Sequence, residues 1–215
     1  MHNLFFISGL GADRRVFNNI QLTGYHITYV DWIEPAIADT IVSYASKLIA
    51  KYHIKSGDIV VGVSLGGIIA IEINKQIGLK KAILISSLKN TDEAPAYFGL
   101  FRLLPVYKLI PATLLTSLGS IMAPIFGPMD KEGKKLFVTM LKDSSPAFMK
   151  WAMGAVLNWH STTHFTNVYE IIGDKDLIFD AKKVTAATIV KGGTHIMIFN
   201  RSKEINAWLI EVLAK

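Results

Sequence analysis

The chain has 215 residues, of which 51% are apolar, a formal net charge of +6 and no cysteine. This length favours one domain with a large core, and the lack of cysteine excludes a disulfide framework and any thiolate metal site. The lysines are scattered in pairs rather than gathered in one run, and no nucleic-acid-binding motif occurs, so we expect no nucleic-acid partner. Residues 1–13 lack the basic start of a signal peptide, and we expect a cytoplasmic protein.

Short apolar segments that predict β-strands alternate with helical segments along the chain. The predicted strands cover residues 3–8, 26–32, 58–63, 81–87, 168–173 and 186–190. Amphipathic helices are predicted over residues 37–52 and 199–213, where apolar residues recur with the helical period. Strands that are apolar throughout are typical of a parallel sheet with helices on both faces. The sequence therefore predicts an α/β fold with a mostly parallel, doubly wound sheet.

Residues 65–78 have an ambiguous pattern, because their isoleucines partly alternate as they would in a strand. Two parallel strands need a crossover between them, and such a crossover is usually a helix. We therefore predict a helix here, ended by Gly78.

Residues 89–167 contain no evident strand and are rich in Leu, Met, Phe, Trp and Pro. This segment is too long for a structureless loop. We expect a helical cap, inserted into an α/β core made of residues 1–88 and 168–215. Residues 109–129 carry no charge over a length that could cross a bilayer. Their three prolines would break a single helix, so we expect short helices and no membrane span.

One serine stands between two glycines at the end of a predicted strand. Residues Gly62-Val63-Ser64-Leu65-Gly66 fit the pattern G-x-S-x-G, and a predicted helix follows. In this motif a sharp strand-to-helix turn exposes the serine hydroxyl, and the flanking residues are small because the backbone passes close to its neighbours. A purely structural turn serine is the alternative, but the strand and helix on either side favour a nucleophile.

A nucleophilic serine needs a base that a third group orients. His195 follows the last predicted strand, and Asp174 and Asp176 follow the strand before it. In doubly wound sheets the catalytic groups gather outside the carboxyl ends of the strands. Ser64, one of the two aspartates and His195 should therefore meet at this edge.

An acyl-transfer site also needs hydrogen-bond donors for the oxyanion that develops on the carbonyl oxygen. The backbone N–H of Leu65, directly after the serine, is one candidate. The loop after the first strand offers the N–H of Leu10, and Gly9 and Gly11 would let that backbone approach a substrate.

These motifs give the sequence a resemblance to the α/β-hydrolase superfamily, closest to a compact esterase-like branch that includes plant methylesterases and hydroxynitrile lyases. The resemblance covers residues 3–88 and 168–213 and rests on the turn at 62–66, the loop at 8–13, and the stretches GDKD and GGTH. In this family the acid usually lies three residues after the glycine that ends its strand, which implies Asp176 and leaves Asp174 as the alternative. Two departures stand out. Ser8-Gly9 replaces the His-Gly of many members, and the family's first two strands have no counterpart.

The resemblance implies a serine hydrolase that cleaves carboxylic esters with an apolar acyl or alcohol part. Ser64 would be the nucleophile, His195 the base and Asp176 the acid, with no cofactor and no metal. The same residues could serve thioester, amide or C–C hydrolysis or cyanohydrin cleavage. A small-molecule receptor built on the same scaffold is a further alternative.

Several other residues have a structural and a functional interpretation. His160 and His164 have the spacing of zinc ligands, but the glutamate of that motif and a third ligand are lacking, so the end of a cap helix is the better interpretation. Asp31 could reach the rim of the site. A group of large apolar residues at near-helical spacing is expected to pack mainly onto the core, with a few members lining the pocket: Phe148, Met149, Trp151, Met153 and Trp159.

Overall fold

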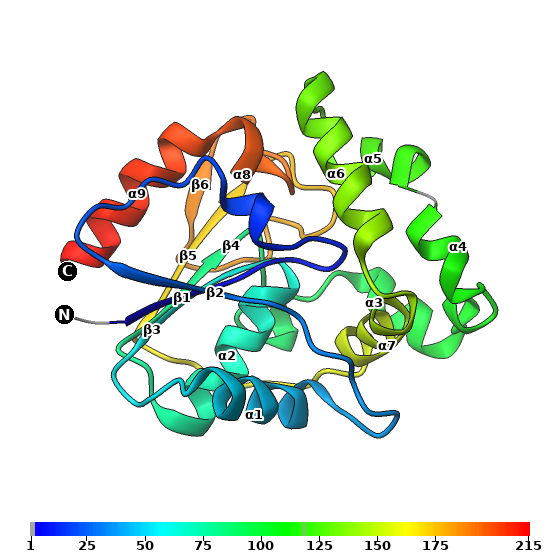
Figure 1. Ribbon diagram of the computed structural model, residues 1–215, viewed down its shortest axis with the longest axis horizontal. Helices are drawn as coiled ribbons and strands as arrows, with labels where there is room; N and C mark the ends of the chain where they lie inside the picture. The colour runs from blue at the N-terminus through cyan, green and yellow to red at the C-terminus, as the bar shows by residue number, and fades with distance from the viewer. Residues whose placement is uncertain (1–2, 118) are drawn as a thin grey trace.

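A computed structural model describes residues 3–117 and 119–215, and its centre is a six-stranded sheet (Figure 1). The strands are β1 (Asn3–Ile7), β2 (His26–Val30), β3 (Ile59–Val63), β4 (Lys81–Ile85), β5 (Val168–Gly173) and β6 (Thr188–Val190). They lie in the order β2-β1-β3-β4-β5-β6, and every neighbouring pair is parallel. The predicted doubly wound parallel sheet is confirmed.

Helices cover both faces of this sheet, so the inner strands β3 and β4 are buried on both sides, while the edge strands β2 and β6 stay partly exposed. Helices α1 (Ile41–Tyr52) and α2 (Leu65–Ile77) pack on one face, where they meet Phe5 and Val60. The other face carries α8 (Met197–Asn200) and α9 (Ser202–Ala214), which meet Leu4 and Val61. Consecutive strand residues thus enter opposite cores, as the two-residue period of a strand requires. The ambiguous segment after Ser64 is helix α2, as the crossover argument predicts.

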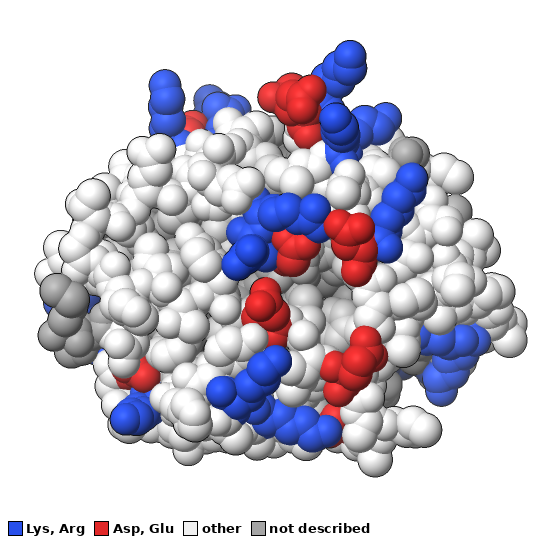
Figure 2. Space-filling model, viewed as in Figure 1, with Lys and Arg blue, Asp and Glu red and all other residues white. Residues whose placement is uncertain are grey.

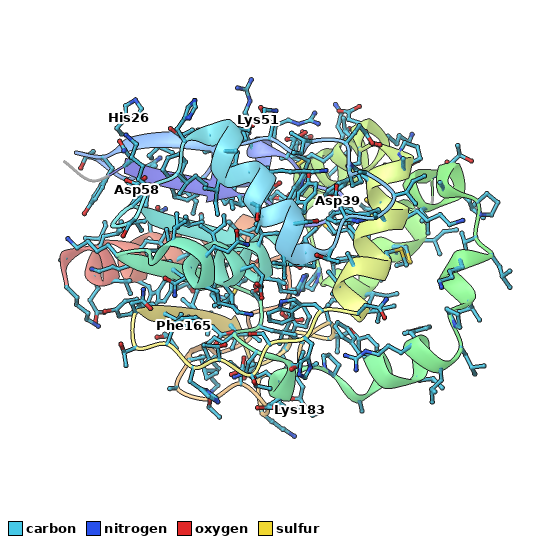
Figure 3. All side chains as sticks on the ribbon, turned by 90° about the horizontal axis from the view of Figure 1, so that it is seen from below. His26, Asp39, Lys51, Asp58, Phe165 and Lys183 are labelled. Carbon is cyan, nitrogen blue, oxygen red and sulfur yellow. The ribbon has the colours of Figure 1, made fainter. Side chains whose placement is uncertain are left out.

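All the helices between β4 and β5 lie beyond the carboxyl ends of the strands. They are α3 (Ala96–Leu103), α4 (Ala112–Ser117), α5 (Gly119–Phe126), α6 (Lys131–Asp143) and α7 (Pro146–Leu157), with short 3₁₀ turns at Thr91–Glu93 and Val106–Lys108. Figure 3 places His26 and Asp58, at the amino ends of β2 and β3, at the far end from these helices. Within the stretch 109–129 the described residues form two short helices, α4 and α5, as expected, although Pro124 lies inside α5. Within the described residues, no helix has the length and apolarity needed to cross a membrane.

Helix α1 begins later than the periodicity predicted, at Ile41 rather than at residue 37. Thr40 is its N-cap: the Thr40 hydroxyl accepts from the backbone N–H of Ser43 at 3.2 Å, and the Ser43 hydroxyl accepts from the Thr40 N–H at 3.0 Å. Such reciprocal capping fixes the start of a helix. The apolar residue at position 37 therefore lies in the preceding loop.

Other predicted boundaries also shift. The second strand ends at Val30 instead of residue 32, and the last begins at Thr188 instead of residue 186. Ala186 has a φ of 57°, which is incompatible with an extended strand. The predicted final helix is two helices, because the helical conformation is interrupted at Arg201 between α8 and α9.

Candidate active site

Ser64 sits in the sharp turn between β3 and α2, with the unusual backbone angles φ 53° and ψ −117°. The surrounding glycines allow this turn. A Cβ on Gly62 would lie 2.2 Å from the backbone carbon and oxygen of Gly66, and a Cβ on Gly66 would lie 2.2 Å from the carbonyl oxygen of Ile7. The Ser64 N–H donates to the carbonyl of Ile85 at 3.0 Å, which ties the turn to β4. The glycines of the motif are thus required by backbone contact around a strained serine.

The structure brings Ser64, His195 and Asp176 together in one chain of contacts. The Nε2 atom of His195 lies 2.9 Å from Ser64 Oγ, and its Nδ1 atom lies 2.9 Å from Asp176 Oδ2. Both His195 and Asp176 are buried. A carboxylate beside Nδ1 holds the proton of a neutral imidazole on that nitrogen, so the Nε2 lone pair faces the serine hydroxyl.

Backbone donors hold the Asp176 carboxylate in place. Its Oδ1 atom accepts from the N–H groups of Ile178 at 2.8 Å and Phe179 at 3.0 Å. The carboxylate therefore presents only Oδ2 to His195. Oδ1 is held by the backbone, and Oδ2 faces the imidazole.

Asp174, the alternative acid, makes a different contact. Its Oδ1 atom accepts from the N–H of Gly192 at 2.6 Å. Next to it, the N–H of Lys175 donates to the carbonyl of Gly193 at 2.9 Å. These bonds join the loop after β5 to the loop after β6, so Asp174 fixes the relative position of the two loops that carry Asp176 and His195.

Leu10 and Leu65 line the same cavity as Ser64 and His195. Leu65 opens α2, where the first backbone N–H groups have no partner within the helix. Gly9, before Leu10, approaches the serine so closely that a Cβ there would lie 3.3 Å from Ser64 Cβ. Both residues therefore lie in the wall of the cavity beside Ser64.

The cavity above Ser64 has a volume of about 430 Å³ and an almost entirely apolar wall. Its floor comes from the loops at the sheet edge, and α3–α7 supply most of the rest. The rings of Phe179 and Phe126 lie 5.2 and 5.7 Å from the His195 ring, centroid to centroid. Such walls keep water away from the imidazole and favour apolar ligands.

No family model matches the chain, and no curated protein matches its sequence. Solved structures do match over nearly the whole chain. A hydrolase from Pseudomonas aeruginosa has a TM-score of 0.78 at 12% identity, with 100% of this chain and 90% of that chain covered. A thermophilic esterase from Thermogutta terrifontis has a TM-score of 0.75 at 14% identity, with coverages of 99% and 90%. An esterase from Exiguobacterium antarcticum has a TM-score of 0.73 at 15% identity, with coverages of 100% and 92%.

The fold is that of the α/β-hydrolases. The resemblance read from the motifs at residues 62–66, 174–176 and 195 is confirmed at the level of the fold. Identities of 12–15% show the fold alone, so the roles of the residues rest on the geometry of this α/β-hydrolase fold itself.

The aromatic and methionine residues of α7 divide between core and cavity. Met149 and Met153 line the cavity. The rings of Phe148 and Trp151 instead pack against Tyr44 of α1, at centroid distances of 6.0 and 4.5 Å. Trp159, just after this helix, donates its indole N–H to Glu72 Oε1 at 2.9 Å. The expectation of mostly core packing with a few lining residues is confirmed.

The aromatic residues of the cavity were not singled out in the sequence, and Phe126, Phe179 and Tyr97 are examples. Phe126 reaches His195 from α5, and no local pattern signals that contact. Phe179 comes three residues after Asp176, which could have marked it. Tyr97 lines the cavity and donates its hydroxyl to the carbonyl of Ile178 at 2.7 Å. Burial, and then the negative charge of Asp176, raises the pKa of Tyr97 to about 12, so its hydroxyl remains protonated at neutral pH.

A second hollow, of about 290 Å³, adjoins the first and is rimmed by acidic residues (Figure 2). Asp31 lines this hollow and not the cavity above Ser64. Arg15 bridges Asp13 at 2.5 Å and Asp143 at 2.6 Å across the rim. Burial opposes ionisation of Asp13, but hydrogen bonds and charge pairing with Arg15 leave the pKa of Asp13 below its usual value. In the described part of the chain, no group of three or more His, Asp or Glu residues could hold a metal ion, and this covers His160 and His164.

Proposed function

We propose that the protein is a serine hydrolase that cleaves carboxylic esters with an apolar acyl or alcohol part. The observation that carries this proposal is the pair of 2.9 Å contacts from His195 to Ser64 and Asp176, at the floor of an apolar cavity. Solved esterases and hydrolases with the same fold support it. The proposal includes residues 89–167 as a helical cap that supplies most of the cavity wall.

In the proposed first half-reaction, Ser64 Oγ attacks the ester carbonyl carbon while His195 Nε2 takes the hydroxyl proton. The carbonyl oxygen becomes an oxyanion, which the N–H groups of Leu10 and Leu65 stabilise. His195 then gives the proton to the leaving alcohol as the carbon–oxygen bond breaks, and the acyl group stays on Ser64.

In the second half-reaction, His195 Nε2 takes a proton from water, and the resulting hydroxide attacks the acyl carbon. The proton returns to Ser64 as the carboxylic acid leaves, so the enzyme is regenerated. Asp176 keeps the imidazole oriented through both steps and stabilises its positive charge. A preformed base and acid favour this enzyme over a receptor built on the same scaffold, because a binding site needs neither.

The test is covalent labelling with a fluorophosphonate probe, read by mass spectrometry, together with hydrolysis of aryl esters. Ser64→Ala should abolish labelling and lower kcat by about 10⁶-fold. Ser86→Ala is the matched control. Like Ser64, Ser86 directly follows a strand and has a positive φ, here 49°, and its buried hydroxyl makes no hydrogen bond within the described residues.

The Ser86→Ala control should label and turn over as the wild type does. Labelling of Ser64→Ala at the wild-type rate would overturn the mechanism. Labelling of the wild type at Ser64 without turnover of any ester would favour the receptor alternative or one of the related reactions.

A further inference from the structure

The segment 96–129 exposes a large amount of apolar side chain to solvent. Within the described part of the chain, eleven of the seventeen exposed large apolar side chains fall between residues 97 and 125. Leu103 and Leu109 are 81% and 85% exposed. We call the following set the outer apolar surface: Leu100, Leu103, Leu104, Leu109, Ile121 and Ile125. Isolated exposed apolar residues are ordinary, but a concentration of this kind marks a site of interaction.

The outer apolar surface lies at one end of the molecule. In Figures 1 and 3 the segment from α3 to α5 forms the end opposite α9 and the C-terminus. This end is the one that the carboxyl ends of the strands face. A flat partner could therefore reach it without touching the rest of the core.

The charges of this segment all have one sign. Residues 96–129 contain Arg102 and Lys108 and no Asp or Glu. Lys150 of α7 lies beside them and donates to the carbonyl oxygen of Lys108 at 2.8 Å. On the face in view in Figure 2, Lys and Arg lie over this end, and a group of Asp and Glu atoms stands beside Lys and Arg at the upper edge. With the start of α6, which packs on α5, residues 96–135 contain five Lys or Arg against Asp130 and Glu132. This end is thus apolar with a net basic charge, which complements an anionic partner.

The outer apolar surface is continuous with the cavity that holds Ser64. Phe101, Val106 and Met122 are exposed to solvent and also line that cavity. An apolar chain that enters beside them can reach Ser64 along an apolar wall. The surface and the cavity therefore suit a partner that has an apolar interior and an anionic boundary.

We propose that the outer apolar surface docks onto a lipid bilayer that contains anionic lipids. Peripheral binding of this kind combines insertion of apolar side chains into the headgroup region with attraction of Lys and Arg to anionic headgroups. A second copy of the chain suits the surface less well. Symmetric pairing would bring Arg102 and Lys108 of two copies together with no carboxylate in residues 96–129 to neutralise them.

This inference goes beyond the proposed function, because binding to a bilayer does not depend on catalysis. The test is flotation of the full chain with vesicles of phosphatidylcholine alone and of phosphatidylcholine mixed with phosphatidylglycerol. The test variant is Leu103→Ser with Leu109→Ser, because neither side chain lines the cavity. The matched control is Ile210→Ser, since Ile210 is 57% exposed on α9 at the opposite end.

The wild type should float with the mixed vesicles, and added salt should weaken that binding by screening the basic residues. The double variant should lose roughly tenfold in partition coefficient, while Ile210→Ser should bind as the wild type does. All three should hydrolyse a short water-soluble ester equally, and Ser64→Ala should still float, so a failure of docking is distinguishable from a failure of catalysis.

Three results would overturn the proposal. The first is a wild type that stays unbound with both kinds of vesicle. The second is a double variant that binds as well as the wild type. The third is a wild type that light scattering shows as a dimer and that the double substitution converts to a monomer, which would assign the surface to a second copy.

Discussion

Replacing Asp176 by Asn changes one carboxylate oxygen into an amino group, and the structure dictates which one. Oδ1 accepts two backbone N–H groups, from Ile178 and Phe179, while Oδ2 faces His195 Nδ1 at 2.9 Å. An amino group cannot accept those two donors. The amide oxygen must therefore take the Oδ1 position, and the amino group must face the imidazole.

An amino group in that position donates to Nδ1, which moves the proton of the neutral imidazole to Nε2. Nε2 then directs an N–H toward Ser64 and cannot take the hydroxyl proton. In a serine hydrolase the wrong tautomer costs about 10⁴-fold in kcat, which equals about 5.4 kcal/mol of activation free energy. The free energy of unfolding should change much less, because both backbone donors keep an oxygen acceptor.

The assay is steady-state hydrolysis of an aryl butyrate by Asp176→Asn, with thermal unfolding measured in parallel. Asp174→Asn is the matched control: it keeps an oxygen acceptor for the Gly192 N–H and faces no imidazole, so kcat should stay within a few-fold of wild type. If Asp176→Asn lost less than about tenfold in kcat, or if Asp174→Asn were the more damaging change, the tautomer argument would be refuted.

Three further predictions concern the turn, the cavity and a buried carboxylate. Gly62→Ala should give an insoluble or unfolded protein in expression and circular dichroism tests, because its Cβ would lie 2.2 Å from Gly66 backbone atoms. In assays of aryl esters, kcat/KM should rise several-fold from acetyl to hexanoyl, since each buried CH₂ contributes about 0.8 kcal/mol; a steady fall would contradict the apolar-acyl assignment. Burial, and then the charge of Glu93, raises the pKa of Glu170 to about 8, above the ordinary 4.5 of the unfolded chain. In this range the native state holds a proton that the unfolded state loses. The free energy of unfolding of the wild type should therefore fall as the pH rises from 4.5 to about 8, by at most about 1.4 kcal/mol per pH unit. Urea titrations across that range should show no such fall for Glu170→Gln. If the free energy of unfolding of the variant fell with pH as it does for the wild type, the assignment of this effect to Glu170 would be refuted.

The parts of the fold that depend on local chemistry could be predicted from the sequence. The sharp turn at Ser64 is one, because its glycines, its strand and its helix are adjacent in the chain. Helix α2 is another, although its pattern alone was ambiguous, because parallel strands impose a crossover. The start of α1 was predicted wrongly, since the Thr40 cap overrides an apolar residue that fits the helical period.

Contacts between distant segments set the limit of sequence reasoning at the site. Sequence left the choice between Asp174 and Asp176 to a family pattern, and only the direction of each carboxylate separates their contacts. Phe126 is a stronger case. It lies on a short helix whose position depends on packing against α6, so nothing near it in the sequence reveals its contact with the His195 ring.

The chemistry and the cavity wall come from different parts of the chain, but those parts are not independent. Ser64, Asp176 and His195 follow β3, β5 and β6, so the register of the parallel sheet fixes their spacing. The inserted helices contribute cavity lining, yet α7 also places Phe148 and Ala152 in the same core cluster as α1 and α2. Removal of the whole insertion would therefore expose the core of the sheet, and loss of activity in such a protein would say little about specificity. Single substitutions among cavity residues of α4 and α5, which add little to that core cluster, are the changes expected to alter substrate choice while the sheet holds Ser64, Asp176 and His195 in place.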